Sequence, residues 1–322
     1  MKKEIGGYFE LEHFDGKSFH ENGIALNSGR GCLSYLTELR QIKTIWIPDF
    51  MCDSVSNCFK RDGVFVHEYS ITEDFLPNYN EIIFDSDSWL YLMDYYGTIE
   101  EDIVNQAYSF SQGRLIVDET HAYYNQPWSN ADTLYTCRKW FGVSDGAYLY
   151  TKDNSILKRS LPNDYSYERM EYMLGRFELS ANEFFRQAQD NNDFFDDQPA
   201  KTMSRITANL LRAIDYKSVA KKRFRNWEIL NKNLSGVNKL KLNQPKTAPF
   251  MYPLLLENAD GVRSMLADMR IYVPTLWPNV AQKNDGSVAC NFAKNILPLP
   301  IDQRYEEEDM KLILEALRVC LN

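Results

Sequence analysis

Leu115-Ile116-Val117-Asp118-Glu119-Thr120-His121-Ala122 is the stretch on which the fold prediction rests. Its apolar start predicts a short buried strand, and Asp118 follows that strand directly. Sheets of α/β proteins bind ligands beyond the carboxyl ends of their strands, so this pattern places a carboxylate where such a ligand would lie. The structural alternative is that Asp118 only caps the following turn. A lone histidine such as His121 is more often a buried structural residue than a catalytic one.

Short apolar strands alternate with helix-like segments on both sides of this stretch. Strands are expected at 24–28, 44–47, 64–69, 89–93, 115–117, 133–136 and 147–150. Helices are expected at 32–39, 52–59 and 100–107. This alternation is typical of a mostly parallel α/β sheet.

The pattern changes after residue 165. Helices are expected at 203–211, 219–230, 261–269 and 306–321, and strands at 250–256, 271–273 and 296–299. The acidic patch 190–197 is expected to be a loop between helices. We therefore predict a large α/β domain with a helical connection at 1–215 and a small α+β domain at 216–322.

Composition narrows the functional class. The chain has 322 residues, of which 44% are hydrophobic and 25% charged, as in a globular protein of about two domains. Lys and Arg number 36 against 45 Asp and Glu, which gives a net charge of −9. This acidic balance argues against a general nucleic-acid-binding protein.

The cysteines and the chain start favour a cytoplasmic protein. The six cysteines are scattered, with no CxxC and no zinc-ligand spacing, so no metal site is expected. The Met-Lys-Lys-Glu start lacks the apolar segment of a signal peptide. No window approaches the run of about 18 apolar residues that a membrane span needs, so no membrane partner is expected.

A second motif places a lysine between two expected strands. It reads Tyr135-Thr136-Cys137-Arg138-Lys139-Trp140-Phe141-Gly142-Val143-Ser144-Asp145-Gly146-Ala147. Burial among aromatic residues and a neighbouring cation such as Arg138 both lower the pKa of an amine, as an imine-forming lysine requires. A solvent-facing Arg-Lys pair is the structural alternative.

A third motif is Leu26-Asn27-Ser28-Gly29-Arg30-Gly31-Cys32, ahead of an expected helix. Small polar residues and glycines at a helix start can bind a phosphate through backbone N–H groups. The motif has neither the GxGxxG of dinucleotide folds nor the GK[ST] ending of a P-loop. It is therefore a weak signal by itself.

The three motifs together match the needs of pyridoxal 5'-phosphate. A carboxylate keeps the pyridine nitrogen protonated, a lysine binds the cofactor covalently, and a helix start holds the phosphate. Asp118, Lys139 and the segment 28–31 supply these groups within one expected α/β domain.

The sequence resembles the DegT/DnrJ/EryC1/StrS family of sugar aminotransferases, which are pyridoxal-phosphate enzymes of fold type I. Asn27–Gly31 is similar to the family's phosphate loop, and Ile45–Phe50 to the strand that follows. Asp118–Ala122 resembles its Asp-Ala-Ala-Gln/His-Ala motif, and Lys139–Gly146 its lysine loop. The resemblance extends to Arg270–Pro278 and to the segment before the last helix.

The resemblance implies a role for each candidate residue. Lys139 would bind the cofactor and act as general base, Asp118 would hold the pyridine nitrogen, and His121 would contact the ring or its 3-hydroxyl. The candidates for phosphate and ring contacts are Ser28, Gly29, Arg30, Cys52, Thr136 and Arg138. Tyr95 and Tyr96 are candidates for the substrate pocket, with core aromatics as the alternative.

The implied function is transfer of an amino group from an amino acid such as glutamate to a nucleotide-linked keto-sugar, in surface polysaccharide or related biosynthesis. The family also implies a homodimer whose partner completes the site, with Lys201 and the Arg205 helix as candidates. Lys139 argues against the family's sugar dehydratases, which carry histidine at that position. Two alternatives stay open: a fold-type-I enzyme with another acceptor or reaction, and a catalytically retired member that acts as a binding partner.

Overall fold

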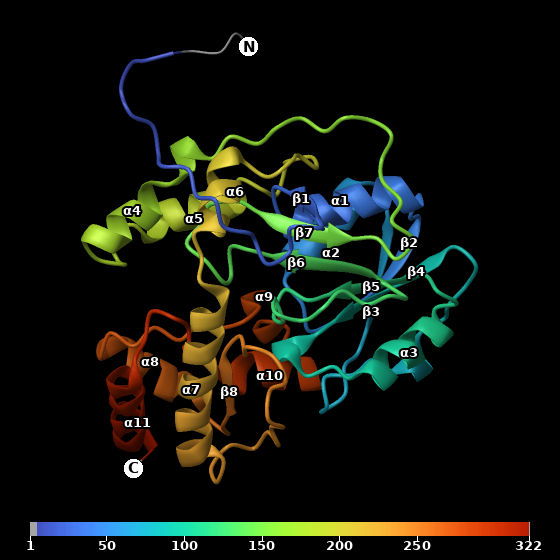
Figure 1. The fold of residues 1–322 in the computed structure, drawn as a ribbon. Coiled ribbons are helices and arrows are strands. Elements are labelled where there is room, and N and C mark those ends of the chain that lie inside the picture. Colours follow the sequence, from blue (N-terminus) through green and yellow to red (C-terminus); the bar gives the residue numbers. More distant parts are fainter. Residues whose placement is uncertain (1–4, 322) are drawn as a thin grey trace.

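A seven-stranded sheet forms the centre of the computed structural model, which describes residues 5–321 (Figure 1). Its strands lie in the order β1-β7-β6-β5-β4-β2-β3. Their bounds are β1 Ile24–Leu26, β2 Thr44–Pro48, β3 Phe65–Tyr69, β4 Ser88–Met93, β5 Leu115–Asp118, β6 Asp132–Thr136 and β7 Ala147–Tyr150. Only β7 runs antiparallel to its neighbours β1 and β6, and the other adjacent pairs are parallel. This confirms the predicted mostly parallel seven-stranded sheet.

Helices cover the sheet and continue beyond it. The helices up to the small sheet are α1 Gly29–Arg40, α2 Asp53–Arg61, α3 Glu101–Phe110, α4 Glu171–Glu178, α5 Phe185–Asp193, α6 Arg205–Arg212 and α7 Tyr216–Leu234. Short 3-10 helices are η1 Tyr79–Glu81, η2 Tyr95–Gly97 and η3 Tyr167–Arg169. The helices α2 and α3 lie on opposite faces of the sheet (Figure 1). The helix α2 connects β2 to β3, and α3 connects β4 to β5; these two connections run in opposite directions along the sheet. Because such crossovers are right-handed, the two helices lie on opposite faces.

The C-terminal part is built around a two-stranded antiparallel sheet. Its elements are β8 Tyr252–Leu255, α8 Ala259–Asp268, α9 Pro278–Ala281, α10 Val288–Asn295, β9 Ile296–Leu299 and α11 Glu307–Leu321. Buried residues of α7, α8, α11 and the two strands form a core of their own. The helix α7 begins at Tyr216 and leads into this part (Figure 1). The boundary at 215/216 stays a prediction.

Two local expectations were wrong. Residues 271–273 form no strand, because Pro274 follows and removes a backbone donor, and no strand pairs with the segment. The acidic patch 190–197 is not entirely a loop, since α5 runs to Asp193. Among residues 5–321, the structure contains no helix that is long and apolar enough to cross a bilayer.

Candidate active site

Asp118 ends β5 and lies buried at the carboxyl edge of the sheet. One carboxylate oxygen accepts a hydrogen bond from the backbone N–H of Thr120 at 2.8 Å, which is the turn-capping contact of the structural alternative. The other accepts from the Tyr91 hydroxyl on the neighbouring strand β4. Because a carboxylate offers about four acceptor positions, both contacts leave room for a ligand donor. They also hold Asp118 in one orientation.

Lys139 lies in the loop between β6 and β7, and this loop is anchored next to the start of α1. The N–H of Gly146 donates to the carbonyl of Asn27 at 2.6 Å. Gly146 has φ +111°, and a Cβ there would lie 2.9 Å from a side chain of α6, so the position requires glycine. Asp145 is buried and accepts from both the N–H and the hydroxyl of Ser204 at 2.7 Å. These contacts fix the loop between α1 and α6.

The Lys139 amine lies close to several predicted site residues. Protein surrounds it, yet its side chain is accessible to solvent and therefore to a ligand. Burial lowers the pKa of Lys139; the nearby Cys52 and Asp118 act in the opposite direction, whereas Arg138 lowers it further. Its Nζ lies 3.5 Å from Nε2 of His121. A lowered pKa is what an imine-forming lysine requires, and the exposed side chain is what the surface Arg-Lys alternative predicts.

His121 is fully buried and surrounded by aromatic rings. The Phe250 ring stacks on it at 4.3 Å between centroids, and the Trp277 ring lies nearly parallel to it at 5.9 Å. Tyr96 contacts it at 5.6 Å. Burial, and secondarily the charge of Lys139, holds the pKa of His121 well below its usual range. His121 is therefore neutral near pH 7.

The start of α1 forms a small cradle. Ser28 is its N-cap residue, and the Ser28 hydroxyl accepts from the N–H of Gly31 at 3.0 Å. Gly29 follows, and a Cβ at this position would lie 2.9 Å from the Thr136 methyl group. The glycine thus lets the helix start approach β6 closely. A helix start with free N–H groups attracts anions such as phosphate.

Two polar groups beside this cradle lack partners within the protein. The Thr136 hydroxyl and the Arg138 Nε are buried, and neither has a hydrogen-bond partner in the part of the chain that the structure describes. The Arg138 guanidinium lies over the Phe195 ring at 4.8 Å, and burial lowers the pKa of Arg138 to about 10. Buried polar groups in native proteins are normally paired. An anion bound at the α1 start would pair both.

Arg30 and Cys52 are engaged differently. The Arg30 guanidinium pairs with Asp196 and donates to Asn192 at 2.9 and 3.1 Å, so the last turn of α5 and the segment after it already satisfy it. Cys52 precedes α2 and its thiol lies 3.0 Å from the Ser54 hydroxyl. Cys52 lies close enough to Lys139 to influence its pKa, so it stays a candidate for a cofactor contact.

The two candidate substrate tyrosines have different surroundings. Tyr95 is 1% exposed and its hydroxyl donates to the carbonyl of Phe50 at 2.6 Å, which fits the core alternative. Tyr96 has φ 60°, a left-handed conformation that is rare for a bulky residue, and its buried hydroxyl has no partner among residues 5–321. Tyr96 therefore remains the better candidate.

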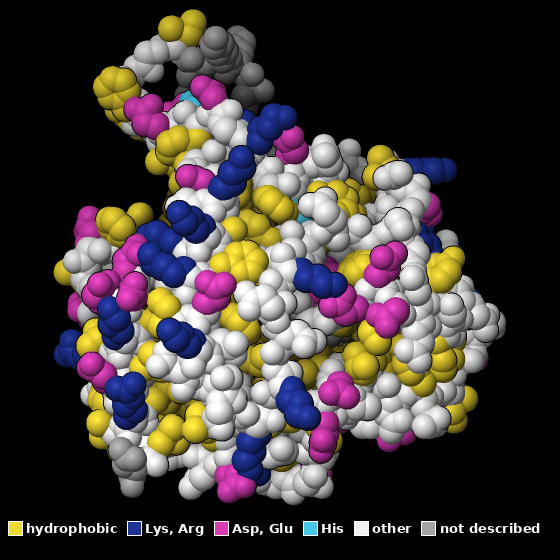
Figure 2. Space-filling view, turned by 60° about the horizontal axis from the view of Figure 1, so that its bottom comes forward, with side chains coloured by type: hydrophobic (Ala, Val, Ile, Leu, Met, Phe, Trp, Pro, Cys, Tyr) yellow, Lys and Arg dark blue, Asp and Glu magenta, His cyan; other side chains and the backbone are white. Residues whose placement is uncertain are grey.

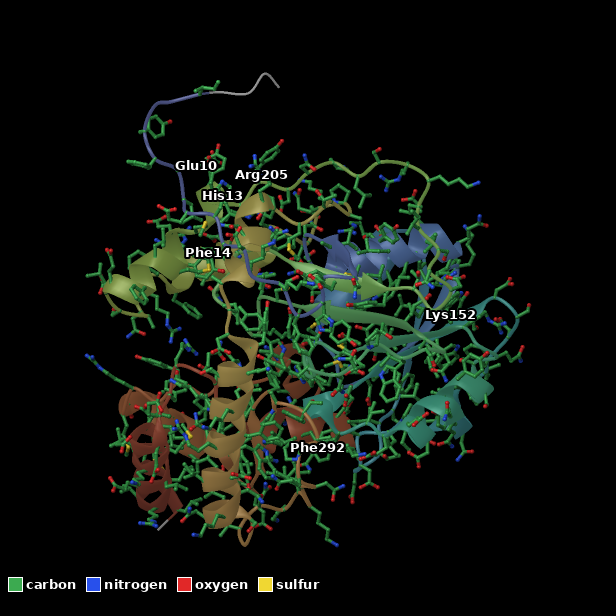
Figure 3. The ribbon with its side chains drawn as sticks, in the orientation of Figure 1. Glu10, His13, Phe14, Lys152, Arg205 and Phe292 are labelled. Carbon is green, nitrogen blue, oxygen red and sulfur yellow. The ribbon has the colours of Figure 1, made fainter. Side chains whose placement is uncertain are left out.

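Tyr96 also lines a cavity of about 710 Å³, which Asn125, Phe292 and the segment 239–246 help to enclose. Figure 3 labels Phe292 in the C-terminal part of the molecule. Lys139, Asp118 and Ser28 do not line this cavity.

A buried acid pair lies next to Asp118. Asp94 and Glu119 are both fully buried, and the Asn125 amide donates to both, at 3.2 and 3.1 Å. Trp128 donates to the second oxygen of Glu119. Burial raises the pKa of each carboxyl group, and in Glu119 the charge of Asp94 raises it further. Both carboxyl groups are therefore protonated more readily than exposed ones, which reduces the negative charge beside Asp118.

Lys201 and Arg205 lie away from the Lys139 amine. The Lys201 amine donates to Gln198 at 2.7 Å. Figure 3 shows Arg205 on the side of the molecule where Glu10 and His13 lie, at the start of α6. The Lys201 backbone pairs with Asn27 beside the α1 start, at 3.0 and 3.3 Å, but its side chain points to Gln198. Both residues stay predictions for a site on a partner subunit.

Sequence reasoning missed Tyr91, Phe250 and Trp277. A hydroxyl within the apolar strand 89–93 was a usable signal for Tyr91. Nothing in the sequence pointed to Phe250 or Trp277, because both reach His121 from the C-terminal part through tertiary packing.

No protein-family model matches the chain, and no curated protein matches it in sequence. Several solved structures are similar to it. The sugar aminotransferase CalS13 from Micromonospora echinospora is 11% identical, with 93% of this chain and 87% of that chain covered and a TM-score of 0.61. A DegT DnrJ EryC1 StrS aminotransferase from Brucella abortus is 15% identical over 92% and 84%, with a TM-score of 0.62.

NtdA from Bacillus subtilis, solved with the bound cofactor PMP, is 11% identical over 92% of this chain and 72% of that chain, with a TM-score of 0.63. At such identities the likeness concerns the fold alone. The chain therefore has the α/β fold of the pyridoxal-phosphate-dependent aminotransferases of fold type I.

Proposed function

We propose that this protein is a pyridoxal-phosphate-dependent aminotransferase of the DegT/DnrJ/EryC1/StrS family. One observation carries the proposal: the Lys139 amine, the Asp118 carboxylate and two unpaired polar groups at the α1 start lie together at the carboxyl edge of the sheet. Each has the chemistry that one part of the cofactor needs. The fold of known aminotransferases supports the same reading.

The residues present fit the cofactor. Ser28, the N–H groups of the α1 start, Thr136 and Arg138 would bind the phosphate. Asp118, oriented by Tyr91, would bind the pyridine nitrogen. Lys139 would bind the aldehyde group through Nζ. A buried donor without a partner is costly, and the Arg138 Nε is such a donor on a cationic group, so Arg138 is the strongest sign of a phosphate site.

Side chains of this protein would then move the proton that leaves the substrate carbon. Bound pyridoxal phosphate supplies an electron sink for the charge left on a substrate carbon that loses its proton. Lys139, displaced by the substrate amine, would take that proton at Nζ and pass it to the carbon of the cofactor's former aldehyde group, as formation of the cofactor's amine form requires. Its lowered pKa favours the neutral amine that can do so. Neutral His121, 3.5 Å away, would hold Nζ in place without adding a positive charge.

We propose a nucleotide-linked keto-sugar as acceptor and an amino acid, glutamate first, as donor. The solved neighbours named for sugar aminotransfer support a sugar acceptor, and Tyr96 with its unpaired hydroxyl is the candidate contact. On the same grounds we propose a cytoplasmic role in surface polysaccharide or related biosynthesis.

We also propose that the protein is a homodimer. Large apolar side chains are exposed on the helical segment that contains α4 and α5, where Phe177 is 92% exposed. They are also exposed on the N-terminal segment, where Tyr8 is 98% and Phe9 99% exposed. Figure 1 shows α4 at the left edge of the molecule and the N-terminal segment projecting above it. Figure 2 shows hydrophobic side chains on the projection at its top. Exposed apolar surface of this kind marks an interaction site, and a partner subunit would cover it.

The test is cofactor binding by the purified protein. Wild type is expected to be yellow with bound pyridoxal phosphate, and borohydride should bleach the band and fix the cofactor to Lys139, as peptide mass spectrometry would show. Lys139→Ala should lose the covalent attachment. Lys152→Ala is the matched control, because Lys152 lies at the opposite end of β7 (Figure 3) and donates to the carbonyl of Gly113.

A half-reaction then tests amino transfer. Glutamate should convert the bound cofactor to its amine form, with loss of the yellow band and release of 2-oxoglutarate. Colourless protein that binds no pyridoxal phosphate would refute the proposal. Normal binding without conversion by any amino acid would refute aminotransfer and leave another reaction of the same fold.

A further inference from the structure

The His121 ring lacks the hydrogen bond that usually orients a functional histidine. In protein sites the ring nitrogen facing away from the ligand commonly bonds to a carbonyl or carboxylate. His121 Nδ1 is buried with no partner among the described residues, while Nε2 lies 3.5 Å from Lys139 Nζ. The chain's other buried histidine differs, since His20 contacts the Tyr123 carbonyl at 2.7 Å and the Tyr150 hydroxyl at 3.3 Å. His121 must be oriented by other means.

Two rings from the C-terminal part restrict the tilt of the His121 ring. Phe250 lies 4.3 Å from it with 18° between the planes, and Trp277 lies 5.9 Å away with 14° between the planes. Both are nearly buried, at 5% and 6% exposure. A ring held nearly parallel to two neighbours cannot tilt without displacing one of them.

The backbone at Trp277 is held in an unfavourable conformation. Trp277 has φ 61° and ψ 70°, a left-handed region that bulky residues rarely adopt. Nearby contacts keep it there: the Asn279 amide donates to the Met51 carbonyl at 3.0 Å, and the Phe50 ring meets the indole edge-on at 4.3 Å. Backbone strain that the surroundings maintain is concentrated at functional sites. Burial of an indole alone does not require it.

We propose that Trp277 is a positioning residue: its indole keeps the His121 ring in the plane that directs Nε2 at the Lys139 amine. In this way the C-terminal part controls a contact made inside the sheet domain. The consequence for the reaction rests on the proposed function, whereas the placement of His121 does not. The two claims can therefore fail separately.

The first test uses protein without cofactor. The chain has four histidines, His13, His20, His67 and His121, so each gives one ring signal in an NMR spectrum of histidine-labelled protein. In wild type the His121 signal should not titrate between about pH 5.5 and 8, because burial keeps the ring neutral. Trp277→Ala should admit water, move this signal and raise the His121 pKa by about one unit or more.

Trp46→Ala is the matched control. Trp46 also stacks on a histidine, His67, at 4.7 Å and 24°, but on β2 and β3. This variant should move the His67 signal and leave the His121 signal unchanged. An unchanged position and titration of the His121 signal in Trp277→Ala would overturn the proposal. If the alanine variant does not fold, two other variants replace it: Trp277→Phe should keep the wild-type His121 signal, and Trp277→Leu should lose that signal. Identical His121 signals in these two variants would overturn the proposal.

The second test uses protein loaded with pyridoxal phosphate. The pH midpoint of the cofactor absorbance band reports the amine environment, so Trp277→Ala should shift it by about half a unit or more while cofactor is retained. Trp277→Phe should restore the wild-type midpoint. Loss of the cofactor in wild type would refute the proposed function and leave the NMR result valid, whereas an unshifted midpoint would refute the link between Trp277 and Lys139.

Discussion

Arg138 is the residue whose substitution tests the proposed phosphate site most directly. Arg138→Met removes a cation that forms no salt bridge among residues 5–321 and whose Nε has no hydrogen-bond partner there, so the stability of the cofactor-free protein should stay within about 1 kcal/mol of wild type. The dissociation constant for pyridoxal phosphate should rise about 10- to 100-fold, as expected for a lost charge-assisted hydrogen bond. Urea unfolding and an absorbance titration measure the two quantities.

Arg30→Met is the control for this prediction. Arg30 pairs with Asp196 and Asn192, so its loss should destabilise the cofactor-free protein by about 1 to 3 kcal/mol. Inorganic phosphate should compete with the cofactor in wild type and less in Arg138→Met. A destabilised Arg138→Met protein with unchanged cofactor affinity would show that Arg138 is structural.

At the scale of elements, the exposed apolar surface of the helical segment with α4 and α5 predicts that two subunits associate there. Phe177→Glu places a charge on the exposed face of α4 and should convert the dimer to monomers, as light scattering after size-exclusion chromatography would show. Phe65→Glu is the control, because Phe65 is 74% exposed on the edge strand β3 and should leave the mass unchanged. A wild-type monomer at micromolar concentration would contradict the proposed dimer.

At the scale of the whole molecule, Arg223 of α7 joins the Lys139 loop to the C-terminal part. It is 1% exposed, lies over Trp140 at 4.3 Å, and donates to the carbonyl of Phe250 at 2.9 Å and to Gln303 at 3.0 Å. Gln303 in turn donates to the Trp140 carbonyl at 2.7 Å. One guanidinium thus contacts Trp140, the chain neighbour of Lys139, and the backbone of Phe250, whose ring stacks on His121.

Arg223→Met should lower the free energy of unfolding by about 3 kcal/mol, since it leaves buried acceptors without a donor. It should also weaken cofactor binding through Trp140. Arg225→Met, on the same helix but paired with Glu306 at the surface, should cost less than about 1 kcal/mol. Equal losses in the two variants, measured by urea unfolding, would contradict the joining role of Arg223.

The sequence by itself determined the sheet, the order of its elements and the segments that carry Asp118, Lys139 and the α1 start. These features are local: apolar strands of four to six residues end in polar or glycine-rich turns, and parallel strands place their carboxyl ends at one edge. It failed at residues 271–273, where β-rich composition has no neighbouring strand to pair with.

Only the tertiary structure decided how the candidates are used. It satisfied Arg30 with Asp196 while leaving Arg138 unpaired, although both arginines read alike in the sequence. It placed Tyr95 in the core. It also brought Trp277 next to His121, although the two residues lie far apart in the sequence. Pairing, burial and stacking depend on residues distant in the chain, and a single sequence does not encode those distances in any local pattern.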